Sequence, residues 1–338
     1  MGCGQGCAFQ RHRNHPVKQV DDSGNRTFSV DAGPGATNTC AMAKIAIVGP
    51  GALGGIMAAW LASNAEHEVI LCARRPLGQL VVETPGETLT VQARVFTKPQ
   101  DVPAVDWVLV ATKTYDAPGA ATWLTPLGAA GAPVAILQNG VEHRERFSPY
   151  LDVDRLLPVL AYCPAERTSP TRIHQRRKAA LVVPEEPLGR DFAALFAGTP
   201  VAISCAADFK SAAWEKLCVN AAGAINALLL QPAGVLRDAP VAELARHLMR
   251  ECLAVGRAEG AVLDDALIER VLELYRNNPA DSINSLHADR LAGRPMEIDA
   301  RNGVIVRLGR KHGIATPCNE MAVTLLEAMA RGTGAPSA

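Results

Sequence analysis

The stretch that decides the fold reads Lys44-Ile45-Ala46-Ile47-Val48-Gly49-Pro50-Gly51-Ala52-Leu53-Gly54-Gly55. A short apolar run rich in β-branched residues passes directly into the pattern G-x-G-x-x-G, and an amphipathic segment follows. In the order strand, glycine turn and helix, this pattern predicts dinucleotide binding rather than an ordinary turn. The phosphates would lie at the helix N-terminus, where free N–H groups and the helix dipole favour anions. The residues expected to contact the cofactor here are Gly49, Pro50, Gly51, Ala52, Leu53 and Gly54.

The end of the second candidate strand, residues 68–75, indicates which dinucleotide is bound. A site for NAD normally carries Asp or Glu at this place, to hold the ribose 2′-hydroxyl. Here the strand ends in Arg74 and Arg75. A guanidinium can bind a 2′-phosphate through paired hydrogen bonds, so the sequence favours NADP(H) and Arg74 as its reader. Lys113, after the apolar run 108–111, could add a second positive charge to the same crevice.

Length and composition set the class of the protein. The chain has 338 residues and 48% hydrophobic content, enough for a globular protein of two domains. Lysine plus arginine equals aspartate plus glutamate at 34 each, and no basic stripe suggests nucleic acid. The longest apolar runs are far shorter than a membrane span. We therefore expect neither a nucleic-acid nor a membrane partner.

The cysteines indicate the redox compartment. There are nine, scattered through the chain and none in a C-x-x-C pair: Cys3, Cys7, Cys40, Cys72, Cys163, Cys205, Cys218, Cys252 and Cys318. Such a set in an α/β enzyme is typical of reduced thiols, which predicts a cytoplasmic protein. No second ligand pair follows Cys3 and Cys7 at zinc-finger spacing, so no metal site is expected.

Residues 1–42 have no hydrophobic period and no apolar core typical of a signal peptide. They cannot bury enough surface to offset their ordering entropy, so the sequence predicts a disordered extension. Met42 stands two residues before the first strand. The extension is therefore also consistent with a mis-assigned start.

From Lys44 the chain alternates strands and helices, which predicts a parallel sheet with helices on both faces over residues 43–206. A hairpin is expected around Pro85-Gly86, and the last strand, Val201–Cys205, would close the sheet. The remaining candidate strands are Lys44–Val48, Glu68–Cys72, Gln79–Thr84, Thr88–Val95, Trp107–Ala111, Val134–Leu137, Leu156–Tyr162, Arg172–Gln175 and Ala179–Val183, with a short helix at Arg190–Ala197. Ligands bind outside the carboxyl ends of such strands, which here means near Gly49, Arg74, Lys113 and Asn139.

Strand patterns stop after Ala206, and helical apolar spacing predicts an all-α second domain over residues 207–332. Gly313 is expected to end one helix and Pro317 to begin the next. The expected helices are Ser211–Leu230, Val241–Glu259, Asp264–Tyr275, Ser282–Leu291, Asp299–His312 and Pro317–Ala330.

Two clusters in this second domain could carry chemistry. Lys216 and Asn220 are four residues apart, on one face of the expected helix. A second polar cluster covers residues 297–303, and Asn284-Ser285 lies upstream of it. Lysines and glutamates on helices are usually solvated. Lys216, however, stands among apolar neighbours, and an ammonium in a desolvated cleft is a better proton donor at neutral pH.

Taken together, these motifs resemble those of the ketopantoate reductase (2-dehydropantoate 2-reductase) family. The shared elements follow in family order: the glycine loop, Arg74, Gln138-Asn139-Gly140, Trp214-Glu215-Lys216-Leu217 with Asn220, Ser285, Glu297-Ile298-Asp299 with Asn302-Gly303, and His312-Gly313-Ile314-Ala315-Thr316-Pro317. The resemblance covers roughly Lys44 to Met329. It implies a Rossmann-type domain followed by a helical domain of the 6-phosphogluconate dehydrogenase C-terminal type.

The resemblance also implies an activity, the NADPH-dependent reduction of ketopantoate to pantoate for pantothenate and coenzyme A synthesis. Lys216 would be the general acid that protonates the carbonyl oxygen, and Glu297 would orient the lysine and the product hydroxyl. Asn220 and Ser285 would bind the substrate. Asn139 would lie between substrate and nicotinamide ribose, so Asn139 and Glu297 would contact the cofactor as well.

One departure leaves the substrate open. Family members commonly carry a second asparagine where this chain has Ala224, and Asn226 would point about 200° around the helix from that place. The first alternative is an NADP-dependent reductase of another 2-keto acid on the same fold. A second is a non-catalytic NADP(H)-binding sensor, which would not need the pairing of Lys216 with Glu297. The protein is expected to be a monomer or a homodimer.

Overall fold

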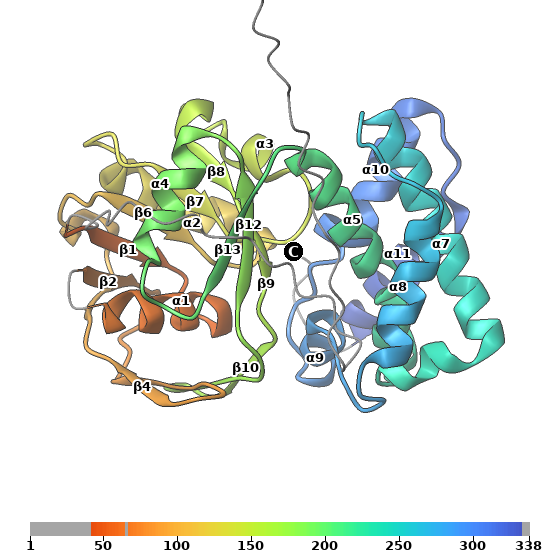
Figure 1. Cartoon of the computed structure of the whole chain (residues 1–338), viewed down its shortest axis with the longest axis horizontal. Helices are drawn as coiled ribbons and strands as arrows, with labels where there is room; N and C mark the ends of the chain where they lie inside the picture. Colours follow the sequence, from red (N-terminus) through yellow and green to blue (C-terminus); the bar gives the residue numbers. More distant parts are fainter. Residues whose placement is uncertain (1–41, 65–66, 333–338) are drawn as a thin grey trace, which may run out of the picture. The chain divides into compact units, whose positions relative to one another are not determined.

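The computed structural model describes residues 42–64 and 67–332 (Figure 1). The expectations for the extension fall on residues outside these ranges, apart from Met42, and so do those for Cys3 and Cys7. No helix in the described ranges is long and apolar enough to cross a membrane.

A six-stranded parallel sheet forms the centre of the first half of the chain and confirms the predicted α/β class. The strands pair in the spatial order β5 (Arg94–Phe96), β2 (Glu68–Cys72), β1 (Lys44–Val48), β6 (Trp107–Val110), β7 (Val134–Ile136) and β8 (Leu156–Pro158). The order reverses direction at β1, between β2 and β6. Ligands of open parallel sheets bind at such a switch point, outside the carboxyl ends of the strands.

Helices cover both faces of this sheet because its buried strands alternate their side chains between the two faces. Ile45 and Ile47 pack with helices α1 (Ala52–Ser63) and α4 (Pro187–Leu195). Ala46 and Val48 pack on the other side with α2 (Ala117–Leu127) and Phe147 of α3 (His143–Phe147). Three short 3₁₀ turns lie in this half: η1 (Pro99–Asp101), η2 (Thr114–Asp116) and η3 (Val153–Arg155).

Two smaller sheets flank the central one. The predicted hairpin is confirmed, because β3 (Leu80–Glu83) and β4 (Thr88–Val91) pair antiparallel. It extends into a four-stranded sheet with β11 (Arg172–Gln175) and β10 (Ala165–Ser169). The third sheet has the order β13 (Ala202–Ala206), β12 (Ala180–Pro184) and β9 (Leu160–Tyr162).

Three strand predictions are corrected by this arrangement. The expectation that Val201–Cys205 closes the main sheet is wrong, because β13 pairs with β12 in the separate three-stranded sheet. The predicted strand Leu156–Tyr162 divides at Val159 into β8 and β9, which belong to different sheets. The predicted strand Thr88–Val95 divides into β4 and β5, and β5 returns to the main sheet beside β2.

The second half is helical, as predicted, and Figure 1 shows its helices in green to blue. The elements are α5 (Phe209–Ala222), α6 (Ala224–Leu229), η4 (Ala233–Arg237), α7 (Ala239–Ala258), α8 (Ala266–Asn277), α9 (Ser285–Leu291), η5 (Asp299–Gly303), α10 (Val304–His312) and α11 (Pro317–Gly332). Gly313 ends α10 with a left-handed φ of 66° and Pro317 begins α11, both as predicted.

Two predicted helices are interrupted. Ser211–Leu230 breaks at Gly223 between α5 and α6. Asp299–His312 begins with the π-helical turn η5, in which the N–H groups of both Arg301 and Gly303 bond the carbonyl of Ile298. The wide turn lets three successive residues, 300–302, all face the interior. We retain 43–206 and 207–332 as the proposed division into domains, with β13 ending at Ala206 and α5 beginning at Phe209.

Candidate active site

The three glycines of the loop between β1 and α1 differ in what the protein itself requires of them. Gly49 has a φ of +85°, and a Cβ there would lie 2.6 Å from Cγ2 of Thr112. A Cβ on Gly54 would lie 2.4 Å from the carbonyl oxygen of Gly49, so helix and strand require glycine at that contact. Gly51 is different, because its Cβ would meet only the Gly49 oxygen, at 4.0 Å. The protein itself does not demand glycine at position 51.

The absence of a side chain at position 51 therefore leaves space for a ligand beside the loop. It is the N-cap of α1 and has no side chain to bond the free N–H groups of the first turn. A pyrophosphate at this helix N-terminus would take those N–H groups, and only a residue without Cβ leaves it room. Pro50 is buried, whereas Ala52 and Leu53 are half-buried at the start of α1. These loop residues fit an NADP(H) cofactor.

Arg74 stands at the end of β2 and extends into solvent, with 84% of its side chain exposed. Its Nη1 lies 3.5 Å from Oδ1 of Asp116 in η2. Arg75 is also exposed. An exposed guanidinium at this strand end can accept a 2′-phosphate without first breaking a buried ion pair.

Lys113 lies at the centre of an ion cluster at the carboxyl end of β6. Its Nζ donates to Oδ2 of Asp289 at 2.6 Å and to Oε2 of Glu297 at 3.1 Å. The Asn139 amide donates to the same Oε2 at 3.0 Å, and the Thr114 N–H donates to Oε1 at 3.1 Å. Three groups from the ends of β6 and β7 thus bond Glu297, which lies 158 to 184 residues later in the sequence.

The cluster keeps both partners charged. Burial alone would lower the pKa of Lys113, but the carboxylates of Glu297 and Asp289 raise it above its ordinary value. Burial alone would raise the pKa of Glu297, but the Lys113 charge and the Thr114 and Asn139 donors lower it. Glu297 is therefore an ionised carboxylate although only 5% of it is exposed.

Lys216 lies on α5, and its Nζ is 5.2 Å from the centroid of the Tyr162 ring at the end of β9. Burial lowers the pKa of Lys216 to about 8; Glu297 opposes this shift and the charge of Arg301 adds to it. Lys216 and Glu297 interact electrostatically. The hydrogen bonds that Glu297 accepts come from Lys113, Thr114 and Asn139. An ammonium with a pKa near 8 is charged at neutral pH and releases its proton readily.

The helix that carries Lys216 and Asn220 is fixed at both ends. Asp208 caps its start by accepting from the Ser211 N–H at 3.0 Å. At its end, four carbonyls accept hydrogen bonds from side chains of other elements. The pairs are Tyr275 Oη with Val219 (3.0 Å), Arg301 Nη2 with Asn220 (2.7 Å), Asn302 Nδ2 with Ala221 (3.3 Å) and Asn284 Nδ2 with Gly223 (2.9 Å).

These donors also explain the break at Gly223. A Cβ there would lie 2.9 Å from Nη2 of Arg301 and 2.9 Å from Nδ2 of Asn284. The convergence places the Asn284-Ser285 segment beside the end of α5, close in space to Asn220. Ser285 is exposed at the start of α9, and Asn220 is half-buried.

Two residues of α6, after the break at Gly223, concern the asparagine that the family resemblance leads one to expect as a substrate ligand. Ala224 is fully buried and offers no polar side-chain atom. Asn226 donates to the Gln231 carbonyl at 3.0 Å and accepts from Asn284 at 3.3 Å, so its amide serves the structure of α6. Asn226 therefore does not replace the asparagine that the resemblance leads one to expect at position 224.

Several residues near the site were not predicted from the sequence. Asp289 is a buried carboxylate that bonds Lys113 and Arg294, and its spacing of four from Ser285 was the only sequence signal for it. Arg301 lies inside the predicted motif but was given no role. Tyr162 lies on β9, below Nζ of Lys216, and Arg167 lies on β10, where its guanidinium donates to the Pro50 carbonyl at 3.3 Å. No sequence motif marked either residue as part of the site.

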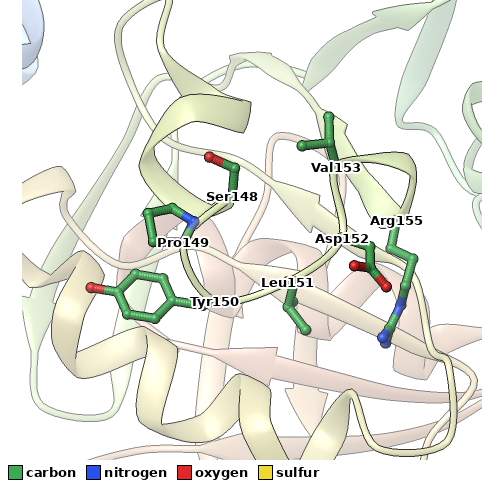
Figure 2. Close-up of a pocket in the computed structure, with 7 residues that line it drawn as sticks. All are labelled: Ser148, Pro149, Tyr150, Leu151, Asp152, Val153 and Arg155. Carbon is green, nitrogen blue, oxygen red and sulfur yellow. The ribbon is translucent and has the colours of Figure 1, made fainter.

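A separate surface pocket of about 540 Å³ lies away from these residues. Figure 2 shows its lining, which comes from the loop between α3 and β8: Ser148, Pro149, Tyr150, Leu151, Asp152, Val153 and Arg155. This loop precedes β8, so the pocket is at the amino end of that strand. The cofactor residues lie at the carboxyl ends of the strands, and the pocket contains none of the predicted site residues.

Comparison with known proteins places these features in a family. Residues 45–187 match the family described as ketopantoate reductase PanE/ApbA, and residues 208–330 match its C-terminal counterpart. A 2-dehydropantoate 2-reductase of Caulobacter vibrioides is 52% identical over 289 residues, covering 86% of this chain and all of the relative. One of Mycobacterium tuberculosis is 41% identical over 292 residues, covering 86% of this chain and 99% of the relative.

A solved structure agrees in fold. The PanE/ApbA family ketopantoate reductase of Ralstonia eutropha JMP134 has a TM-score of 0.78 and 33% identity, covering 86% of this chain and 99% of that one. Both halves of the chain, and nearly the full length of each relative, are included in these matches. The chain belongs to the ketopantoate reductase family.

Proposed function

We infer that this protein is an NADPH-dependent 2-dehydropantoate 2-reductase, which forms (R)-pantoate for pantothenate and coenzyme A synthesis. The observation that carries the inference is Lys216, an ammonium with a pKa of about 8 on a helix fixed at both ends. A carboxylate, Glu297, lies within its electrostatic reach and is bonded to the carboxyl ends of β6 and β7. Relatives of 52% and 41% identity carry the same activity in their names.

Reduction of a 2-keto acid leaves negative charge on the former carbonyl oxygen, and this oxygen needs a proton. When bound, NADPH supplies the hydride that adds to the carbonyl carbon. Lys216 stabilises the developing oxyanion by its charge and donates the proton from Nζ. Its lowered pKa makes the ammonium a stronger acid than an exposed lysine would be.

Glu297 keeps Lys216 protonated in the resting enzyme, because its negative charge raises the lysine pKa against the effect of burial. Its rigid hold by Lys113, Thr114 and Asn139 fixes the position of that charge. Asn139, bonded to Glu297, stands at the end of β7, where cofactor and substrate meet in an open parallel sheet. Asn220 and Ser285 are the proposed substrate ligands.

A panel assay tests this function. Oxidation of NADPH is followed by absorbance with 2-dehydropantoate and with other 2-keto acids that differ in their branched carbon. We expect 2-dehydropantoate to give the highest kcat/KM, and NADPH to be preferred over NADH. A higher kcat/KM with another keto acid would assign that substrate instead, and no turnover with any keto acid would contradict the reductase function. We propose that the protein is cytoplasmic and is a monomer or a homodimer. Sedimentation of the purified protein would decide between these two oligomeric states.

A further inference from the structure

Arg301 has the bulkiest fully buried side chain of the described residues, with 2% of the residue exposed. Its Nη2 donates to the Asn220 carbonyl at 2.7 Å. Its Nε is buried and finds no hydrogen-bond partner in the part of the chain that the structure describes. Within residues 42–64 and 67–332, no carboxylate forms an ion pair with this guanidinium. Among the described residues, Arg301 is therefore a buried positive charge with no carboxylate in direct contact, and the charges of Glu297 and Asp289 act on it from a greater distance.

Burying such a charge costs free energy unless it is paired. Burial lowers the pKa of Arg301, but guanidinium remains protonated in proteins. Capping the end of α5 does not require a charge, because Tyr275, Asn284 and Asn302 perform the same task with neutral donors. The cost of the charge points to a role that a neutral donor could not fill.

The nearby carboxylates are already occupied. Asp289 bonds Lys113 and Arg294, and Glu297 bonds Lys113, so the direct ion pairs of these two acids are made with two other cations. Lys216 and Arg301 add two further positive charges, which interact electrostatically with each other and with the Glu297 carboxylate. The site around Asn220 thus carries an excess of positive charge in a largely buried environment, which favours an anionic substrate.

We infer that Arg301 is the specificity-determining residue of the proposed reductase, and that its positive charge selects a substrate bearing a carboxylate next to the reacting carbonyl. The inference rests on the proposed function for the identity of the substrate. The carboxylate of a 2-keto acid lies one carbon from the oxygen that Lys216 protonates, so it must enter the same positively charged region. Arg301 is fixed on the backbone of Asn220 and presents its charge without rearrangement.

Two neutral variants test the role of the charge. Arg301→Met replaces the guanidinium by an apolar chain, and Arg301→Gln retains an amide donor for the Asn220 carbonyl. The substrates are 2-dehydropantoate and its neutral 2-keto amide. We expect each variant to lower kcat/KM for the acid about 10²-fold or more, since loss of one partner of a buried charge pair costs this much. The amide should change less than about threefold, because it presents no charge to Arg301.

Tyr275→Phe is the matched control. It removes a neutral donor from the same helix end and leaves the charge of Arg301 in place. The ratio of acid to amide kcat/KM should remain at the wild-type value in this control. Equal losses for acid and amide in both Arg301 variants would overturn the inference and leave Arg301 a structural residue. Either variant alone decides the question if the other fails to fold.

A binding measurement separates this inference from the proposed function. Calorimetry with NADP⁺ present compares the products, pantoate and its neutral amide, in the wild type and the variants. We expect the wild type to bind pantoate more tightly than the amide and both Arg301 variants to lose this preference. An enzyme that turns over no 2-keto acid would refute the proposed function, while the acid-to-amide binding ratio would still decide the role of Arg301. A wild-type protein without that preference would overturn the role of Arg301 even if reduction is observed.

Discussion

Replacing Lys113 by methionine removes the cation that joins the end of β6 to the helical half of the chain. Its Nζ is 2.6 Å from Asp289 and 3.1 Å from Glu297, whose side chains are only 6% and 5% exposed. Loss of one partner of a fully buried pair typically costs about 3–5 kcal/mol, because an uncompensated charge remains. Lys113 itself is 35% exposed, so solvent screens part of its interaction. Asp289 also keeps Arg294, and Glu297 keeps Asn139 and the Thr114 N–H.

We therefore expect Lys113→Met to lower the free energy of unfolding by about 2–3 kcal/mol at pH 8, between the ranges for buried and exposed pairs. The pH dependence has a defined sign. The folded-state pKa of Glu297 is lowered in the wild type, so its contribution is present above its unfolded pKa and disappears as the pH falls through the folded value. Without Lys113, the effect of burial on the Glu297 pKa is opposed less strongly, so this pKa should be higher than in the wild type. The penalty should shrink as the pH falls from 8 toward 5, because the variant's carboxyl becomes protonated.

Urea unfolding at pH 8 and at pH 5 measures both effects. Lys311→Met is the matched control, since Lys311 pairs with Glu259 at 2.8 Å but is 61% exposed. Its loss should remain below about 1 kcal/mol at pH 8. A Lys113→Met penalty equal to that of Lys311→Met, or one that does not change with pH, would refute the view that this cluster is a buried ion network.

Three further predictions concern the cofactor and the acid. Gly51→Ala should weaken NADPH binding at least tenfold without lowering Tm, because a Cβ there meets only an oxygen at 4.0 Å, whereas Gly54→Ala should lower both NADPH affinity and Tm. Equal losses of Tm in the two variants would contradict the view that only the cofactor requires glycine at position 51. Arg74→Ala should raise KM for NADPH far more than for NADH, with Arg75→Ala as control, and equal increases would exclude Arg74 as the reader of the 2′-phosphate. Glu297→Gln should move the basic limb of the kcat/KM profile to lower pH, because Glu297 raises the pKa of Lys216; an unchanged limb, or one moved upward, would contradict the coupling.

The local patterns predicted much of the fold. β1, the glycine turn and α1 follow from an apolar run and three glycines in the order typical of a dinucleotide-binding loop. The β3–β4 hairpin and the Gly313 cap were likewise predictable, since the signals lie within a few residues of the structure they produce.

The errors have a common physical cause, which is tertiary contact. α5 ends at Gly223 because donors from η5, α8 and α9 converge there, and apolar periodicity continues through the break. Apolar alternation likewise cannot show that β13 pairs with β12 rather than with the central sheet. Both depend on residues far away in the sequence.

The site shows the same limit. Lys216 and Glu297 could be selected from their motifs, but the cluster that holds Glu297 joins it to Lys113 across 184 residues and to Asn139 across 158. Asp289 and Arg301 belong to helices whose burial is set by packing, so a charged residue there looks like any solvated one in the sequence. Their positions became informative only when their partners, and the missing partner of Arg301, were known.

The central claim is that Lys216 donates the proton during reduction, and one comparison tests it most directly. Lys216→Ala is measured against Lys210→Ala, which removes an exposed lysine from the same helix. Loss of a positioned acid commonly costs about 10²–10⁴ in rate, so kcat of Lys216→Ala with the best keto acid should fall at least 10²-fold. NADPH binding should be retained, Lys210→Ala should keep wild-type turnover, and Lys216→Arg should not restore activity, because guanidinium holds its proton too tightly. A near-normal kcat in Lys216→Ala would contradict the account.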